Sequence, residues 1–289
     1  MPHDQPVIPV RSADGHAFEL IHVQAARARA SLLFLPGMGL SARQYIAFAQ
    51  ALAEKDITVY LHEYRGLGSS SLRASRTVDW GYRELLERDI SAVLQRLESQ
   101  PRPLPLIVGG HSLGSQLAAL AAAMNPLAVS GLLLVAGGVP FWREFPTRLG
   151  LPLRIAQTVM PLIASLIGHY PGRKLGFAGR EARSVMRDWS RSGRTGSYRV
   201  SGMDSDLDSA MARLETPILG IRMADDWLIP ETSFRGLLDR LGKGPATSKL
   251  VDGRHADHYG WMQQPGTVVG LVDSWLNSFG SGQSSRDIS

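Results

Sequence analysis

Cysteine is absent from this chain of 289 residues, so disulfide bonds, thiolate metal sites and a cysteine nucleophile are excluded. A long uninterrupted hydrophobic run is also missing. The most apolar stretch, Leu149–Ile167, contains Arg154 and two prolines and is not interpreted as a membrane span. The first six residues show no cationic start followed by an apolar run, so we predict no secretory signal and expect a cytoplasmic protein.

Charge of one sign does not dominate the sequence. The 31 basic and 26 acidic residues leave a net charge of +5, and nearly all the basic residues are arginine. Outside one segment described below, no basic stripe is interleaved with aromatic residues, so nucleic acid is not an expected partner. With 44% hydrophobic and 20% charged residues, the composition is typical of a globular protein with a sizeable core.

Apolar runs typical of strands alternate along the chain with amphipathic runs typical of helices. A hairpin is expected first, over Val7–Val10 and Ala17–Val23. The later strands are expected at Ala30–Leu35, Ile57–His62, Leu104–Gly109, Gly131–Ala136, Pro217–Met223 and Ser248–Val251. The helices are expected at Ala42–Lys55, Trp80–Glu98, Leu113–Met124, Thr232–Leu241 and Gly266–Phe279. This order predicts an α/β fold with a mostly parallel, twisted sheet and helices on both faces, since parallel neighbours need crossover connections.

The alternation stops between residues 139 and 205, where helical patterns occur without a convincing buried strand. We therefore predict a core formed by residues 1–138 and 206–279 and a helical cap inserted over 139–205. The Gly- and Ser-rich segment 280–289 is expected to be a disordered tail. Residues 139–200 carry eleven basic and three acidic residues, a net charge of +8, so the rest of the chain carries −3.

Five large apolar residues recur at helical spacing inside this cap: Leu151, Ile155, Val159, Leu162 and Leu166. One hypothesis is a helix packed on the sheet edge with a solvated basic exterior. The other is a lid whose apolar face lines an acyl pocket and whose basic face attracts anionic acyl carriers or an anionic lipid surface. The second would give peripheral contact with a membrane and no stable insertion.

The pentapeptide Gly110–Gly114 lies between an expected strand and an expected helix and has the pattern G-x-S-x-G. In this context the pattern indicates a sharp strand-to-helix turn that exposes Ser112 at the carboxyl end of the sheet and at a helix N-terminus. Glycine is needed on both sides because the turn brings backbone segments too close for a Cβ. Ser112 is therefore the candidate nucleophile.

A serine nucleophile needs a base, and the base needs a carboxylate that orients it. The strand ending at Met223 is followed by Asp225 and Asp226, and Asp226 is favoured because it stands four residues before Pro230. The loop after the last strand holds His255 and His258. His258 is favoured as the base because it stands at the entry to the final helix. His111 adjoins the nucleophile, but a packing role is the better interpretation because the turn points adjacent side chains apart.

The tetrahedral intermediate of acyl transfer needs two backbone N–H donors. The first candidate is Leu113, the residue after the nucleophile. The second is Met38, in the loop Pro36–Gly39, where the glycines permit a close approach of the backbone.

Taken together, these motifs resemble those of the α/β-hydrolase superfamily over about residues 17–279. The segment Glu63–Ser70 is similar to the superfamily's D-x-R-G-x-G-x-S loop, with Glu63 in place of the usual Asp. Further segments resemble a bacterial group of predicted hydrolases of undefined substrate: Asp79–Trp80, Gly138–Arg143, Tyr170–Arg173 and His258–Trp261. Ser115 departs from that group, many members of which carry a second glycine after the turn.

A serine at this position implies a serine hydrolase that cleaves a carboxylic ester or thioester through an acyl-enzyme, with a small-molecule acyl substrate. No metal and no organic cofactor are implied. An acyltransferase would use the same triad and stays open, because the sequence does not separate it from hydrolysis. A non-catalytic binding module is the other alternative, although such a protein would normally have lost a triad residue.

Overall fold

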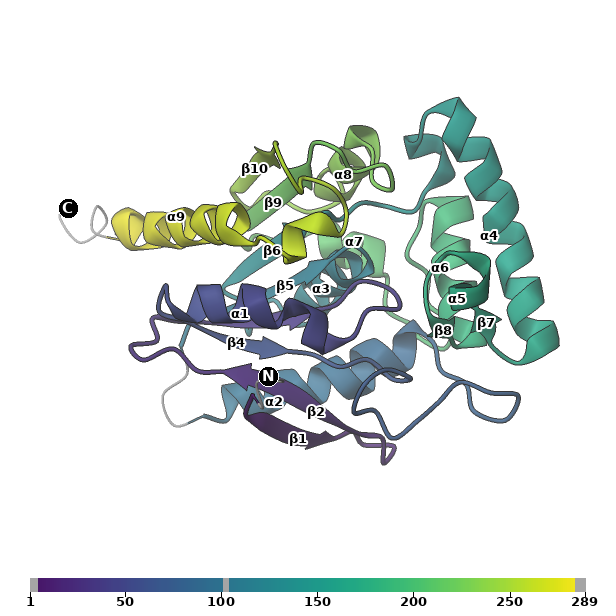
Figure 1. Cartoon of the computed structure of the whole chain (residues 1–289), viewed down its shortest axis with the longest axis horizontal. Coiled ribbons are helices and arrows are strands. Elements are labelled where there is room, and N and C mark those ends of the chain that lie inside the picture. The colour runs from purple at the N-terminus through teal and green to yellow at the C-terminus, as the bar shows by residue number, and fades with distance from the viewer. Residues whose placement is uncertain (1–4, 101–103, 284–289) are drawn as a thin grey trace.

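The computed structural model describes residues 5–100 and 104–283 as an eight-stranded sheet flanked by helices, with a helical layer at one end (Figure 1). The strands of the main sheet are β1 (Val7–Arg11), β2 (Ala17–Val23), β3 (Ala30–Leu35), β4 (Ile57–Leu61), β5 (Leu106–His111), β6 (Gly131–Val135), β9 (Ile218–Met223) and β10 (Ala246–Val251). The main helices are α1 (Ile46–Ala53), α2 (Ser91–Glu98), α3 (Leu113–Met124), α4 (Thr147–Ile167), α6 (Arg183–Thr195), α7 (Leu207–Ala212), α8 (Glu231–Leu238) and α9 (Gly266–Gln283). The short elements are η1 (Ala42–Tyr45), η2 (Glu84–Ile90), η3 (Trp142–Glu144), β7 (Tyr170–Pro171), α5 (Gly172–Leu175), β8 (Arg180–Glu181) and η4 (Gly260–Met262).

The strand order is β1-β2-β4-β3-β5-β6-β9-β10. The hairpin β1–β2 is antiparallel and joins β4 in antiparallel fashion, whereas every pairing from β4 to β10 is parallel. The predicted α/β class with a mostly parallel sheet is therefore confirmed. Parallel strands point their carboxyl ends to one edge, so the loops after β3, β5, β9 and β10 meet there.

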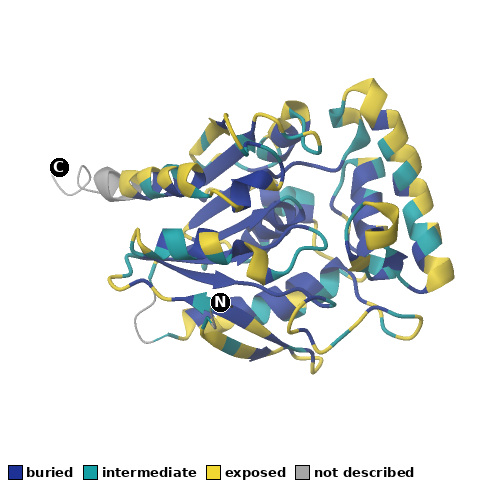
Figure 2. Ribbon diagram, viewed as in Figure 1, coloured by how far each residue is buried: buried dark blue, intermediate teal, exposed yellow. Residues whose placement is uncertain are grey.

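The sheet separates two hydrophobic cores, because successive side chains of a strand point to opposite faces. On one face, α1 and α9 cover alternate residues of the central strands, such as Leu32, Phe34 and Leu133. On the other face, α2, α3 and α7 cover Leu33, Leu35 and their neighbours. The central strands are accordingly buried along their whole length (Figure 2).

Three expected element boundaries need correction. The helix expected over Ala42–Lys55 begins with a 3₁₀ turn, and the one over Trp80–Glu98 contains the π-helical segment η2. The expected disordered tail begins too early, because α9 continues to Gln283 and residues 280–283 are helical. Continuing a formed helix adds one hydrogen bond per residue fixed, which outweighs the weak helix propensity of glycine and serine here. Residues 284–289 of the expected tail lie outside the described part of the chain.

The helical insertion, residues 139–205, contains α4, the short β7–β8 pair, α5 and α6. Residues 79–82, which precede η2, hold the insertion in place through hydrogen bonds. Asp79 accepts hydrogen bonds from the backbone N–H (3.1 Å) and the hydroxyl (2.8 Å) of Ser184, and Asp188 accepts one from the Tyr82 N–H at 3.0 Å. α4 packs against α6 and not against the sheet, so the expectation that its five-residue apolar stripe covers the sheet edge is wrong.

The loop that resembles D-x-R-G-x-G-x-S is held by a buried network of charges. Arg65 donates two hydrogen bonds of 2.7 Å to Asp89 and also pairs with Asp14. His16 contacts Asp89 through Nδ1 and the Ser70 hydroxyl through Nε2 at 2.9 Å. All five side chains belong to one network, which offsets the cost of burying the charges. The network joins the β1–β2 turn to η2 and gives this loop a role in the scaffold.

Glu63, the acidic residue of that loop, makes the stability of the fold depend on pH. Its side chain is 3% exposed, and burial raises its pKa to about 7 against the opposing hydrogen bond from the Ala42 N–H. A raised folded-state pKa stabilises the fold below the unfolded value of 4.5, and this stabilisation is lost as the pH rises through about 7.

In Glu63→Gln the site is neutral at every pH, so we expect the decline of unfolding free energy between pH 4.5 and 7 to be shallower than in the wild type. The difference should amount to about 3 kcal/mol across the window. Urea unfolding followed by circular dichroism at several pH values measures it. The exposed Glu98→Gln serves as the control and should follow the wild type. Parallel curves for wild type and Glu63→Gln would show that the buried carboxyl does not titrate in this range.

Candidate active site

Ser112 lies on a strained turn between β5 and α3. Its backbone φ of 55° and ψ of −116° are unusual for a residue with a side chain. A Cβ on Gly110 would stand 2.2 Å from the Gly114 carbonyl carbon, and a Cβ on Gly114 would stand 2.0 Å from the Leu35 carbonyl oxygen. Both positions therefore require glycine, as the sequence pattern implied. The turn holds the serine at the edge of the sheet where the strand ends converge.

Ser115 supports this turn from below. Its hydroxyl donates a 2.6 Å hydrogen bond to the Gly110 carbonyl, and its side chain is fully buried. A Cβ on Gly137 would approach the Ser115 hydroxyl to 2.4 Å, so the segment that follows β6 passes directly beside it. The residue that departs from the bacterial group thus contributes a hydrogen bond to the strained segment.

Asp226 and His258 face each other across 2.8 Å, measured from the carboxylate Oδ2 to the imidazole Nδ1. The other carboxylate oxygen, Oδ1, accepts hydrogen bonds of 2.9 Å from the backbone N–H groups of Leu228 and Ile229. Both side chains are almost completely buried. The loop after β9 therefore fixes the carboxylate, and the carboxylate fixes the orientation of the imidazole.

The competing residues take other positions. Asp225 is exposed, and its backbone N–H donates to the Ala256 carbonyl. His255 occupies a left-handed backbone conformation with φ of 67°, in the turn that precedes His258. Of the two aspartates and two histidines in these loops, Asp226 and His258 are therefore the pair that the structure brings into contact.

His111 is completely buried beneath His258, with the two ring centroids 4.7 Å apart. Burial holds the pKa of His111 well below its usual range. The Tyr45 hydroxyl accepts the Gly37 N–H at 2.9 Å and is 2.8 Å from His111 Nδ1, which leaves its own hydrogen for the imidazole. Trp261 packs against the rings of Tyr45 and His111. His111 thus packs under the base and, through Tyr45, fixes the loop after β3.

Met38 and Leu113 both border the cavity beside Ser112. Within residues 5–100 and 104–283, neither backbone N–H donates a hydrogen bond to another protein group. The loop holding Met38 is pressed against the helical insertion, because a Cβ on Gly39 would stand 2.4 Å from the Gly179 nitrogen. Two free donors, one in the loop after β3 and one at the start of α3, therefore border the cavity beside the serine.

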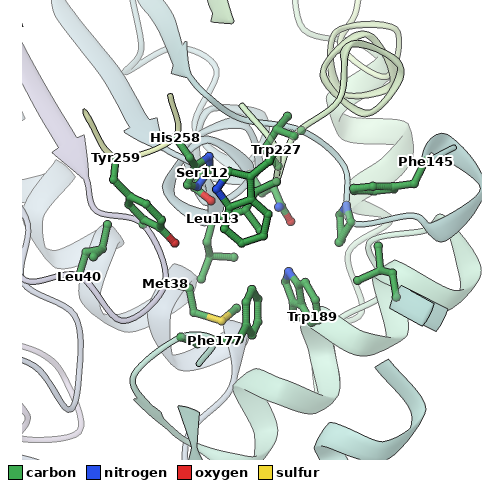
Figure 3. A pocket seen from close by; sticks show the side chains of 18 of the residues that line it. Met38, Leu40, Ser112, Leu113, Phe145, Phe177, Trp189, Trp227, His258 and Tyr259 are labelled. Carbon is green, nitrogen blue, oxygen red and sulfur yellow. The ribbon is translucent and has the colours of Figure 1, made fainter. Parts of the chain in front are cut away.

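A cavity of about 200 Å³ opens beside Ser112. Figure 3 shows Ser112 next to His258, with Phe177 and Trp189 of the helical insertion across the cavity. The remaining lining is mostly apolar: Gly37, Met38, Leu40, Leu113, Gln116, Gly138, Pro140, Phe145, Leu149, Leu153, Ala178, Trp227, Leu228, Ile229 and Tyr259. No Asp, Glu, Lys or Arg lines it within the part of the chain that the structure describes.

Sequence reasoning missed several residues of this site. Tyr45 precedes His111 by 66 residues, and nothing in the sequence links the two. Gln116 is the one side-chain amide among the described lining residues, and its carbonyl oxygen accepts a hydrogen bond from the Tyr198 hydroxyl at 3.2 Å. Trp189 and Phe177 come from the insertion, whose packing over the sheet no local pattern predicts. Only the spacing of Gln116, four residues after Ser112 on α3, could have indicated that it faces the same side.

The fold and this arrangement define an α/β hydrolase, and a comparison with protein families agrees. Residues 26–258 match the family described as serine aminopeptidase, S33, and the chain belongs to that family. The superfamily inferred from the motifs is therefore confirmed, and the protein is an enzyme of the hydrolase class. The matched segment includes Ser112, Asp226 and His258.

Individual relatives are more distant. The chain is 22% identical to a monoglyceride lipase from Rattus norvegicus over 273 residues, covering 92% of this chain and 88% of the relative. A thermophilic esterase from Thermogutta terrifontis, solved with malate bound, superimposes with a TM-score of 0.63 at 16% identity, covering 94% and 98% of the two chains. A thioesterase domain from the curacin biosynthetic pathway gives a TM-score of 0.63 at 16% identity, covering 93% and 99%. The family match and the lipase relative support ester hydrolysis, and the two structures support the fold.

Proposed function

We propose that this hydrolase cleaves a carboxylic ester or thioester with an apolar acyl group, through an acyl-enzyme formed on Ser112. The observation that carries the proposal is the 2.8 Å hydrogen bond between Asp226 and His258. His258 lines the same cavity as Ser112, which lies on its strained turn. Nucleophile, base and orienting carboxylate come from the loops after three strands, as acyl transfer by a serine requires.

In the proposed reaction, His258 Nε2 removes the Ser112 proton as the hydroxyl oxygen attacks the substrate carbonyl. Asp226 holds Nδ1–H and stabilises the imidazolium that forms. The Met38 and Leu113 N–H groups donate to the oxyanion, and the N-terminus of α3 adds its favourable dipole. His258 then protonates the leaving group, and a water molecule that it activates releases the acid. Ser112 and His258, both described by the structure, form no hydrogen bond with each other, and we expect this bond to form when substrate binds.

The cavity lining favours an uncharged acyl group over the amino end of a peptide. An aminopeptidase must hold a substrate ammonium group, and a buried ammonium group needs an anionic or hydrogen-bonding partner. The described lining offers no free carboxylate, whereas leucine, tryptophan and phenylalanine side chains surround most of the space. Apolar acyl chains would gain by leaving water for such a cavity.

Acyl-chain profiling tests this proposal. Across p-nitrophenyl esters from acetate to decanoate, kcat/KM is expected to rise about fourfold for each buried methylene, then level off once the cavity is full. The corresponding thioesters should follow the same order, and leucine p-nitroanilide should not be cleaved.

Two variants control the experiment. Trp189→Ala enlarges the cavity and should move the plateau to longer chains, whereas Leu127→Ala, at a fully exposed site, should leave the profile unchanged. A profile independent of acyl length, or faster cleavage of the aminoacyl anilide than of every ester, would contradict the proposal.

A further inference from the structure

The apolar stripe of α4, defined as Leu151, Ile155, Val159, Leu162 and Leu166, faces solvent. Its members are 42–76% exposed, and Leu166 is the most exposed of them. Helix α4 forms the outer edge of the molecule, away from the sheet (Figure 2). Since five large apolar side chains at helical spacing lie on one surface over about 22 Å, they form a continuous patch. Patches of this kind mark a surface that binds a partner or a membrane.

The opposite face of α4 fastens the helix to the protein. Gln157 is fully buried, and its amide donates a 2.7 Å hydrogen bond to the Pro140 carbonyl. Its own backbone carbonyl accepts from Arg194 of α6, and Gly150 lies directly against the Trp142 carbonyl. The 21-residue helix is long and apolar enough to span a bilayer, but spanning would break these contacts. The apolar stripe is therefore presented by a helix that stays bound to the fold.

The helix that carries the stripe has charges of one sign. α4 contains Arg148 and Arg154 and no acidic residue, and both arginines are exposed. Arg143 and Arg154 lie over the ring of Trp142, at 5.1 Å and 4.9 Å from its centroid, beside the start of the helix. The surrounding segment 139–200 carries a net +8. A second copy of the chain would bring like charges together across the stripe, whereas an anionic lipid surface would complement them.

The helix that carries the stripe also borders the candidate active site, but with other residues, so the hypothesis that the stripe itself lines an acyl pocket is wrong. Leu149 and Leu153 of α4 line the cavity beside Ser112, and Leu149 is itself 43% exposed. Trp227, which also lines the cavity, is 68% exposed. One helix thus connects the outer apolar surface with the cavity.

We propose that the apolar stripe of α4 and the adjoining arginines form a docking surface for an anionic lipid bilayer, in which α4 lies along the interface without crossing it. The apolar side chains enter the boundary between headgroups and acyl chains, and the guanidinium groups contact the headgroups. Docking places the cavity next to a source of apolar esters. The proposal does not depend on the reaction at Ser112.

Vesicle sedimentation tests the proposal with the full chain carrying Ser112→Ala, so that the lipid stays intact. This parent should sediment with vesicles of phosphatidylcholine and phosphatidylglycerol in a ratio of 7:3. Adding Ile155→Gln, Leu162→Gln and Leu166→Gln should lower the partition coefficient at least about tenfold, because three large apolar side chains are lost from the contact. Arg148→Gln should lower it about fivefold. Pure phosphatidylcholine vesicles or 0.5 M NaCl should lower it further, because they weaken the attraction of every arginine around the stripe.

A matched set of exposed apolar residues elsewhere provides the control. Val7→Gln, Leu127→Gln and Leu250→Gln should leave vesicle binding unchanged. When the three α4 substitutions are made in the wild-type chain, which keeps Ser112, the protein should retain its Tm and its kcat on a soluble ester. That result would show that the variant folds. Absence of vesicle binding by the parent, or equal binding by the parent and the α4 variant, would overturn the proposal. So would a dimer in sedimentation velocity that the α4 substitutions abolish, because the stripe would then bind a second copy.

Discussion

Replacing Ser112 by alanine should lower kcat for a p-nitrophenyl ester by roughly 10⁴- to 10⁶-fold while leaving the fold intact. The large effect is expected because the covalent step has no substitute: among residues 5–100 and 104–283, no other hydroxyl shares the strained turn and the adjacent imidazole. Residual turnover would come from the free N–H groups of Met38 and Leu113 and from substrate binding. Alanine removes only the hydroxyl and keeps the short side chain at φ of 55°.

Two measurements check this expectation. A fluorophosphonate should form one adduct, which peptide mass spectrometry should place on Ser112 and which Ser112→Ala should lack. Ser115→Ala is the matched control, because its hydroxyl lies three residues away but is bonded to the Gly110 carbonyl. Labelling of another serine, or full esterase activity of Ser112→Ala, would contradict the assignment of the nucleophile.

The second large effect is expected at Asp226 and His258. Asp226→Asn should lower kcat about 10⁴-fold, because the amide can hold the imidazole in the wrong tautomer, and His258→Ala should cost at least as much. The asparagine can still accept the N–H groups of Leu228 and Ile229, so the loop should keep its shape.

Neighbouring residues of the same type serve as controls. Asp225→Asn and His255→Asn should each change kcat by less than about tenfold, and asparagine is chosen for His255 because it tolerates a positive φ. Steady-state kinetics on one ester compares the four variants. Loss of activity in His255→Asn with retained activity in His258→Ala would reverse the assignment of the base.

Much of this molecule could be predicted from local sequence patterns. Buried parallel strands give continuous apolar runs such as Ala30–Leu35, and helices of ten or more residues between them leave few other arrangements. The strained turn was also recognisable, because close backbone approach at Gly110 and Gly114 leaves glycine as the only residue that fits. The placement of Asp226 and His258 follows from the rule that parallel strands end at one edge.

Contacts between distant segments could not be predicted in this way. The hydrogen bonds that join Gly37, Tyr45 and His111 depend on how α1 packs against the sheet, and no periodicity encodes them. The apolar cavity likewise forms only because the insertion brings Phe177 and Trp189 opposite Ser112. No charged side chain lines the cavity among the described residues, and this property, which favours an uncharged substrate group, arises only when the insertion packs over the sheet.

Local sequence patterns are sufficient to predict the α/β order of elements, the glycine-flanked turn at Ser112 and the two loops that supply Asp226 and His258. These features depend on spacing within short segments, where side-chain alternation and backbone sterics act directly. Which face of α4 is covered depends instead on the packing of the folded chain. Helical periodicity shows that Ile155, Leu162 and Leu166 share a side, but burial depends on the neighbour that α4 meets. Because α6 contacts the side that holds Gln157 and Ala164, the larger apolar stripe is left facing solvent.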